Sequence, residues 1–124
     1  MPRSKAEEAL SEAEAHWTAG EPAQAREAYR RARLHYHEVE DRGGEAQALA
    51  RLGELEHRQG HYKTSRELLV EARGLLTGDA DPIAQADILI LLGEVERSDH
   101  NPGAACQALE SANELYQGAG DPGG

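Results

Sequence analysis

Apolar residues recur along the chain at steps of three and four positions, the spacing that lines one face of an α-helix. The first such stripe contains Ala6, Leu10, Ala13 and Trp17. Short polar segments rich in Gly, Pro and Asp separate it from five later stripes. The pattern therefore predicts six helices, at about 4–19, 22–40, 45–59, 62–76, 82–97 and 102–117. Six helices joined by short turns pair as three antiparallel hairpins.

Capping signals mark several of the predicted helix ends. Ser4 is placed to cap the first helix, with Glu7 three residues later. Asp81 precedes Pro82, which combines an N-cap residue with a proline in the first turn. Residues 41–44 are glycine-rich and indicate a break between the second and third helices.

A period of forty residues underlies the six stripes. Residues 46–56 and 86–96 agree at six of eleven positions without a gap, and a weaker copy precedes them. Both stretches contain a glycine inside a predicted helix, Gly53 and Gly93. Glycine costs about 1 kcal/mol relative to alanine in a helix interior, so its recurrence predicts a close approach of the partner helix. A fixed period of this size is typical of stacked helical repeats.

The period divides the chain into one all-α domain of three repeats. We expect the domain to cover residues 4–117, with repeats at about 4–41, 44–80 and 81–117. Residues 118–124 contain four glycines and a proline and are expected to form a disordered tail.

The repeated residues resemble the tetratricopeptide repeat. The second copy carries the resemblance through Leu49, Leu52, Gly53, Gly60, Tyr62, Leu69 and Ala72, and the third through Leu89, Leu92, Gly93, Ala105, Leu109 and Ala112. The resemblance implies a right-handed superhelix, an α-solenoid, in which the first helix of each hairpin lines a concave groove. It implies a non-catalytic module that binds a peptide or a protein segment there and uses no cofactor.

The repeat length allows a second interpretation. Forty residues exceed the 34 that are usual for this family. Long repeats of this kind resemble the helical sensor arrays of large bacterial transcription activators. The alternative function is therefore a ligand- or peptide-sensing regulatory module associated with a bacterial transcription regulator.

The charge of the chain restricts its partners. The formal net charge is −10, which argues against nucleic acid and anionic membranes and suits a basic protein partner. There is one cysteine, so an internal disulfide is excluded and a reducing compartment is expected. We see neither a signal peptide nor an apolar run long enough to span a membrane, and we expect a cytoplasmic protein.

Superposing the repeats predicts three rows of side chains along the groove. The first row is Glu14, Glu54 and Glu94, which we interpret either as a solvated face or as a site for lysine and arginine side chains of a partner. The second row is Leu10, Ala50 and Ile90, and the third is Trp17, His57 and Arg97. Arg58 and Arg97 are spaced to pair with the second and third of these glutamates. The candidate partner-binding residues are Leu10, Glu14, Trp17, Glu54, His57, Arg58, Ile90, Glu94 and Arg97.

Two of these residues carry competing interpretations. Trp17 is either an anchor of the core or an exposed platform in the groove. His57 and His61 are four residues apart and are therefore candidate metal ligands. However, Gly60 interrupts the helix between them, and no further ligands accompany them. A zinc site needs four ligands, so we expect no bound metal.

The C-terminal repeat is expected to mediate self-association. Residues 88–92 are all apolar, which is typical of a helix buried on every side. We predict no helix after the sixth to cover its outer face, so we expect either a two-fold dimer of the third repeats or truncation from a longer array whose next repeat covers that face. The residues expected at a two-fold interface are Ile88, Leu91, Cys106, Leu109, Leu115 and Tyr116.

Overall fold

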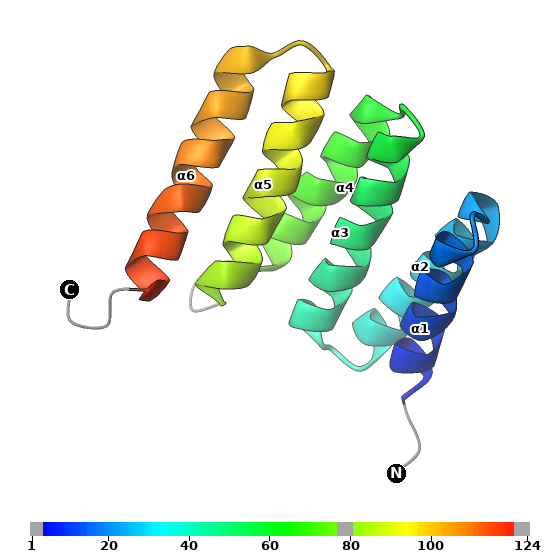
Figure 1. Ribbon diagram of the computed structural model, residues 1–124. Coiled ribbons are helices and arrows are strands. Elements are labelled where there is room, and N and C mark those ends of the chain that lie inside the picture. The colour runs from blue at the N-terminus through cyan, green and yellow to red at the C-terminus, as the bar shows by residue number, and fades with distance from the viewer. Residues whose placement is uncertain (1–3, 77–80, 121–124) are drawn as a thin grey trace.

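The computed structural model describes residues 4–76 and 81–120, and the side chains of residues 4–76 and 81–118. Within these residues the chain forms six α-helices (Figure 1). They are α1 (Lys5–Thr18), α2 (Pro22–Glu38), α3 (Arg42–Arg58), α4 (Tyr62–Leu75), α5 (Pro82–Ser98) and α6 (Pro102–Gly120). The predicted number and order of helices are confirmed, and every end lies within three residues of its predicted position.

The helices pack as three hairpins, α1–α2, α3–α4 and α5–α6, which stack in the order of the chain (Figure 1). Neighbouring hairpins meet where α2 packs against α3 and where α4 packs against α5. In addition, α5 contacts α3, so the first helices of the second and third hairpins lie side by side. The core is therefore shared between neighbouring hairpins, as in other stacked repeats.

The four turns between helices that the structure describes in full share one geometry. Gly20, Glu40, Gly60 and His100 all have positive φ angles, of 77°, 57°, 83° and 63°. At each of these turns the next amide donates to the carbonyl five residues back, at 2.7–2.9 Å. This is the bond that closes a Schellman turn at a helix C-terminus. The spacing of twenty between the first three turns shows that the forty-residue repeat consists of two equal helix–turn units.

Side chains cap the first turns of α1 and α5, as predicted. The Ser4 hydroxyl oxygen accepts a 3.1 Å hydrogen bond from the Glu7 amide. The Asp81 carboxylate accepts one of 2.9 Å from the Ile83 amide. Each bond satisfies an amide that has no partner inside its helix.

The glycines at the start of α3 belong to the helix, which corrects the predicted break at residues 41–44. The carboxylate of Asp41 accepts a 2.9 Å hydrogen bond from the Gly44 amide, and the helix begins directly after this cap. A Cβ atom at position 44 would overlap the ring of Tyr36 in α2. Glycine is present here because α2 and α3 approach closely, and it does not end a helix.

The glycine in the middle of α3 confirms the predicted close contact within the hairpin. A Cβ atom at Gly53 would lie 2.7 Å from Cγ of Leu69 and 3.4 Å from the carbonyl oxygen of Ser65. The Ser65 hydroxyl donates a 2.6 Å hydrogen bond to the Gly53 carbonyl. Gly93 repeats the arrangement in the third hairpin, where a Cβ atom would lie 3.0 Å from Cγ of Leu109.

Arginine–glutamate pairs join the hairpins at equivalent positions. Arg26 of α2 donates from Nε and Nη2 to Glu56 of α3, at 3.2 and 2.8 Å. Forty residues later, Arg66 of α4 donates to Glu96 of α5 at 2.5 Å and to Asp99 at 2.7 Å. The hydrogen bond to Asp99 raises the pKa of Arg66 most, and the hydrogen bond to Glu96 raises it further. These pairs attach the first helix of a hairpin to the hairpin before it, and so fix the positions of α3 and α5.

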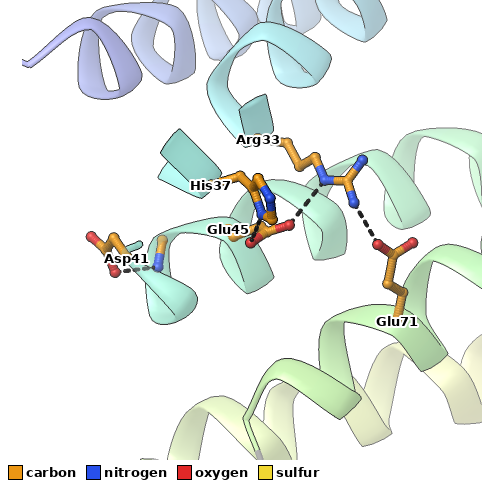
Figure 2. A network of polar contacts seen from close by, with 6 residues as sticks. Arg33, His37, Asp41, Glu45 and Glu71 are labelled. Carbon is orange, nitrogen blue, oxygen red and sulfur yellow. Dashed lines mark hydrogen bonds and ion pairs between the residues drawn. The ribbon is translucent and has the colours of Figure 1, made fainter. Parts of the chain in front are cut away.

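A second polar network reinforces the joint between the first two hairpins (Figure 2). Arg33 of α2 lies between two carboxylates, donating to Glu45 of α3 at 3.1 Å and to Glu71 of α4 at 2.6 Å. His37 contacts the other oxygen of Glu45 at 3.1 Å. Glu45 is only 4% exposed, and a buried carboxylate needs such partners. The network ties three helices together beside the start of α3.

The last helix is longer than predicted. We expected α6 to end near Gln117 and residues 118–124 to form a tail, but the helix continues to Gly120. Glycine weakens a helix by about 1 kcal/mol per residue without forbidding it, so a glycine-rich end can still be helical. Residues 121–124 lie outside the described residues.

Candidate functional site

An open groove of about 860 Å³ lies between α3 and α5. Its lining comes from three segments: Arg42, Gly43, Gln47, Ala50, Arg51 and Glu54 of α3; Leu75 at the end of α4 with the cap residues Leu76 and Asp81; and Ala84, Asp87, Ile88, Ile90 and Leu91 of α5. We call this surface the α3–α5 groove. It lies between the first helices of two hairpins, where the resemblance to the tetratricopeptide repeat led us to expect a groove.

The floor of the groove is apolar and belongs to the core. Leu76 and Ile88 are buried in the main core cluster. Leu75, Ile90 and Leu91 are half-buried and pack against the same cluster. Because these side chains are held by core packing, the floor offers a fixed apolar surface to a binding partner.

The two sides of the groove carry opposite charges. On the α3 side are Arg42 and Arg51, both exposed, and the half-buried Glu54, so two guanidinium groups outnumber one carboxylate there. On the α5 side are Asp81, which caps α5, and Asp87, which accepts a hydrogen bond from the hydroxyl of Tyr116. The groove therefore has one basic and one acidic side over an apolar floor.

The predicted glutamate row is interrupted by an arginine. Glu54 lines the groove, but its neighbour is Arg51, at 4.0 Å, and not the predicted Arg58. Among the described residues Glu94 forms no ion pair, so its predicted pair with Arg97 is absent. Glu14 is exposed on α1 and does not line the groove.

The same charges act on the buried hydroxyl of Tyr29. Burial raises the pKa of Tyr29, Glu14 raises it further, Arg51 lowers it and Glu54 raises it again. Glu14 lies on α1, whereas Arg51 and Glu54 lie on α3. The region between α1 and α3 is thus of mixed charge, and the three glutamates do not form an uninterrupted carboxylate surface.

Trp17 packs against the core, which is one of its two predicted roles, and it does not line the α3–α5 groove. It is half-buried and packs, together with Leu10, against a core cluster that includes Ala13 and Tyr29. The guanidinium of Arg58 lies over its ring, 5.8 Å from the centroid. This cation–π contact gives Arg58 an intramolecular partner on the surface between the first two hairpins.

The two histidines considered for metal binding have separate partners. His57 Nε2 lies 2.8 Å from the hydroxyl of Ser98, and its ring lies 5.7 Å from that of Tyr62. His61 Nδ1 lies 3.5 Å from Glu56. Across the described part of the chain, no group of three His, Cys, Asp or Glu side chains is placed to hold a metal ion.

The residues expected at a self-association interface fall on different surfaces. Ile88 and Leu91 line the α3–α5 groove. Leu115 and Tyr116 are half-buried against the core, and the Tyr116 hydroxyl bonds to Asp87 on α5. Only Cys106 and Leu109 are exposed, and both lie on α6.

The environment of Cys106 makes its thiol less acidic. Its Sγ lies 3.5 Å from Glu110 Oε1, and this hydrogen bond raises the pKa of Cys106.

Several groove residues were absent from the candidates. Gln47, Arg51 and Asp87 line the groove close to predicted residues, and the repeat alignment contains a signal for them, since positions 47 and 87 are equivalent. Leu75 and Leu76 come from the end of a second helix, where no repeat rule pointed to the groove. Of the candidates, Glu54 and Ile90 line the groove, together with Ile88 and Leu91 from the expected interface.

No family model matches the sequence, and comparison with curated proteins gave no match either. Among the described residues no helix is both long and apolar enough to cross a membrane.

A solved structure shares this architecture. The crystal structure of BtubC (BKLC) from P. vanneervenii superposes with a TM-score of 0.83 at 16% sequence identity. The match covers 93% of this chain and 48% of that one, so this chain spans about half the length of BtubC. At this identity the likeness concerns the fold. The chain is thus an all-α protein whose three stacked antiparallel hairpins have the tetratricopeptide-like fold predicted from its repeats.

Proposed function

We propose that this protein is a non-catalytic interaction module whose α3–α5 groove binds a segment of another protein. The observation that carries the proposal is an open groove with an apolar floor and charged sides. An apolar surface rimmed by polar residues is typical of a protein-binding site, because burial of the floor drives association and the rim sets specificity.

The chemistry of the lining supports a binding role. Its described residues include no histidine, cysteine, serine or lysine. The lining therefore lacks four common nucleophiles and bases, and its polar groups are arginines, carboxylates and an amide.

The expected basic partner remains part of this proposal, with a narrower set of contacts. Asp87 and Glu94 on α5 supply carboxylates with no cation bound to them among the described residues. Glu54 lies 4.0 Å from Arg51, which offsets its charge, and Glu14 lies on α1, outside the groove. We therefore assign attraction of lysine or arginine side chains mainly to α5.

A sensor of small ligands is the second candidate. The groove volume of about 860 Å³ lies within the range of about 300–1,000 Å³ found for small-molecule sites. A sensor would associate with a transcription regulator and change its affinity for that partner on binding a ligand. Thermal stabilisation by a compound library, abolished when the groove is filled, would favour this candidate over the first.

Self-association through α6 is a further part of the proposal, supported by one comparison between repeats. Leu109 is 43% exposed, whereas Leu69, its equivalent in the second hairpin, is fully buried. Self-association predicts a dimer in sedimentation at micromolar concentration that the Leu109→Glu variant reduces to a monomer. A clean monomer of the unaltered protein would contradict it.

The proposed binding site can be tested with one matched pair of variants. Peptides are selected from a random display library on the unaltered protein and then measured against Gln47→Trp and Gln24→Trp. Gln47 is exposed in the groove, whereas Gln24 is exposed on α2, away from it. We expect Gln47→Trp to weaken binding by about tenfold or more and Gln24→Trp to leave it unchanged. Peptides that bind both variants equally would contradict the assignment of the groove.

A further inference from the structure

The α3 side of the groove has guanidinium groups available to a partner. Arg42 forms no ion pair with any described residue, and Arg51 has its nearest carboxylate, Glu54, at 4.0 Å. Both arginines in the inter-hairpin pairs, Arg26 and Arg66, lie closer to their carboxylates, at 2.8 and 2.5 Å. The guanidinium groups that face the groove therefore retain donors that structural contacts have not taken up.

The α5 side of the groove carries two carboxylates, Asp81 and Asp87, and neither forms an ion pair with a residue that the structure describes. Asp87 Oδ1 accepts a hydrogen bond from the Tyr116 hydroxyl. Because this donor is neutral, the negative charge of Asp87 is not compensated. Glu94 lies further along the same helix, outside the groove lining, and has no ion pair within the described part of the chain. Residues 82–96 contain no lysine, arginine or histidine, so α5 supplies no internal counter-charge before Arg97.

A partner must therefore meet three surfaces at once: a basic side, an apolar floor and an acidic side. An extended strand directs its side chains alternately to two opposite faces. It can therefore cover the floor of the groove, but mainly its backbone would face the two charged sides. A helix projects side chains all around its axis. It can place an apolar stripe on the floor and charged residues on each flank.

We propose that the α3–α5 groove selects an amphipathic helix with acidic residues along one flank and basic residues along the other. The acidic flank faces Arg42 and Arg51 of α3, the apolar stripe covers Leu75, Ile88 and Leu91, and the basic flank faces Asp87 of α5. This inference rests on the proposed function and specifies the partner of the same site. Because the two sides of the groove differ in charge, it also fixes the direction in which the helix lies.

Three synthetic helical peptides with the same leucine stripe test this selectivity. One carries glutamate on one flank and lysine on the other, the second carries glutamate on both flanks, and the third carries lysine on both. We expect the mixed peptide to bind most tightly. Each single-sign peptide should bind about two- to fivefold more weakly for every lost contact, and added salt should reduce the difference.

Charge reversal of the α3 side provides the second arm. In the Arg42→Glu/Arg51→Glu variant both sides of the groove are acidic, so the lysine peptide should become the tightest binder. The control is Arg30→Glu/Lys63→Glu, which changes the net charge equally at exposed positions outside the groove. This control should leave the mixed peptide in first place.

The outcomes separate this inference from the function on which it rests. If the lysine peptide binds most tightly to the unaltered protein, or if charge reversal leaves the order unchanged, the two-sided charge selection is wrong. A proline in the centre of the mixed peptide that leaves affinity unchanged would refute the helical conformation. If library-selected peptides still depend on Gln47 while none of the three helices binds, the inference fails and the proposed function stands. If the library peptides are also insensitive to Gln47→Trp, both fail.

Discussion

Arg26 of α2 lies 2.8 Å from Glu56 of α3, and the same pair recurs forty residues later as Arg66 and Glu96. Each pair links a second helix to the first helix of the following hairpin. The helices held in this way, α3 and α5, form the two sides of the groove. The repeated ion pair therefore connects the sequence period to the geometry of the proposed binding site.

Removing one carboxylate from these two arginine–glutamate pairs should destabilise the fold. The Glu56 side chain is 9% exposed, so Glu56→Gln leaves Arg26 with a weaker acceptor in a largely dry environment. We expect a loss of about 1–3 kcal/mol in the free energy of unfolding, measured by urea denaturation. The control is Glu12→Gln, because the Glu12–Arg31 pair is exposed and such pairs contribute about 0–1 kcal/mol. Equal effects of the two changes on the free energy of unfolding would contradict a structural role for the Arg26–Glu56 pair.

Two glycine-to-alanine changes should have opposite effects. Alanine at position 53 would place its Cβ atom 2.7 Å from Leu69, which is fully buried and cannot easily move. We expect overpacking to cost about 1–3 kcal/mol and to outweigh the better helix propensity of alanine. Gly74, in α4, has nothing within 4 Å of the same atom, so alanine there should stabilise by about 0.5–1 kcal/mol. Thermal unfolding of both variants measures the contrast, and a stable Gly53→Ala protein would disprove the close contact.

The protein should lose stability at alkaline pH through two tyrosines. Burial is the main cause that raises the pKa of Tyr29 and Tyr36 above 10.0, and nearby carboxylates add to it. The unfolded chain then releases these protons at lower pH than the folded protein. Their contribution is therefore fully present below pH 10 and is lost as pH rises through the higher folded-state pKa values.

Denaturation at increasing pH checks this expectation. Tyr29→Phe should flatten the alkaline decline, because phenylalanine has no proton to lose. The ultraviolet absorbance of tyrosinate should also show fewer late-titrating groups in that variant. A decline of unchanged steepness in Tyr29→Phe would mean that other groups govern the alkaline limb.

The helices and their contacts within hairpins were accessible from the sequence because they depend on local spacing. Ser4 and Asp81 indicate helix starts through their own capping chemistry, and Gly53 indicates a close contact because glycine is costly in a helix. The break predicted at residues 41–44 was misplaced for a related reason. Glycines that permit close packing, such as Gly44, look the same in sequence as glycines that end a helix.

The groove could be predicted only in part, because it depends on the relation between hairpins. Aligned repeats place Glu14, Glu54 and Glu94 in one row only if successive hairpins are spaced and rotated equally. In the structure α5 packs more closely on α3 than α3 does on α1. Long side chains add a second difficulty, since Arg51 reaches Glu54 and Arg58 reaches Trp17 by rotations that no repeat pattern specifies.

The most direct test of the proposed binding site maps it residue by residue. Backbone amide NMR signals of the unaltered protein are followed while a library-selected peptide is added. We predict that the largest shift changes fall on α3, on α5 and at the end of α4, centred on Gln47, Arg51 and Asp87. Changes concentrated instead on α2 or on the exposed face of α6 would contradict the assignment of the α3–α5 groove as the binding site.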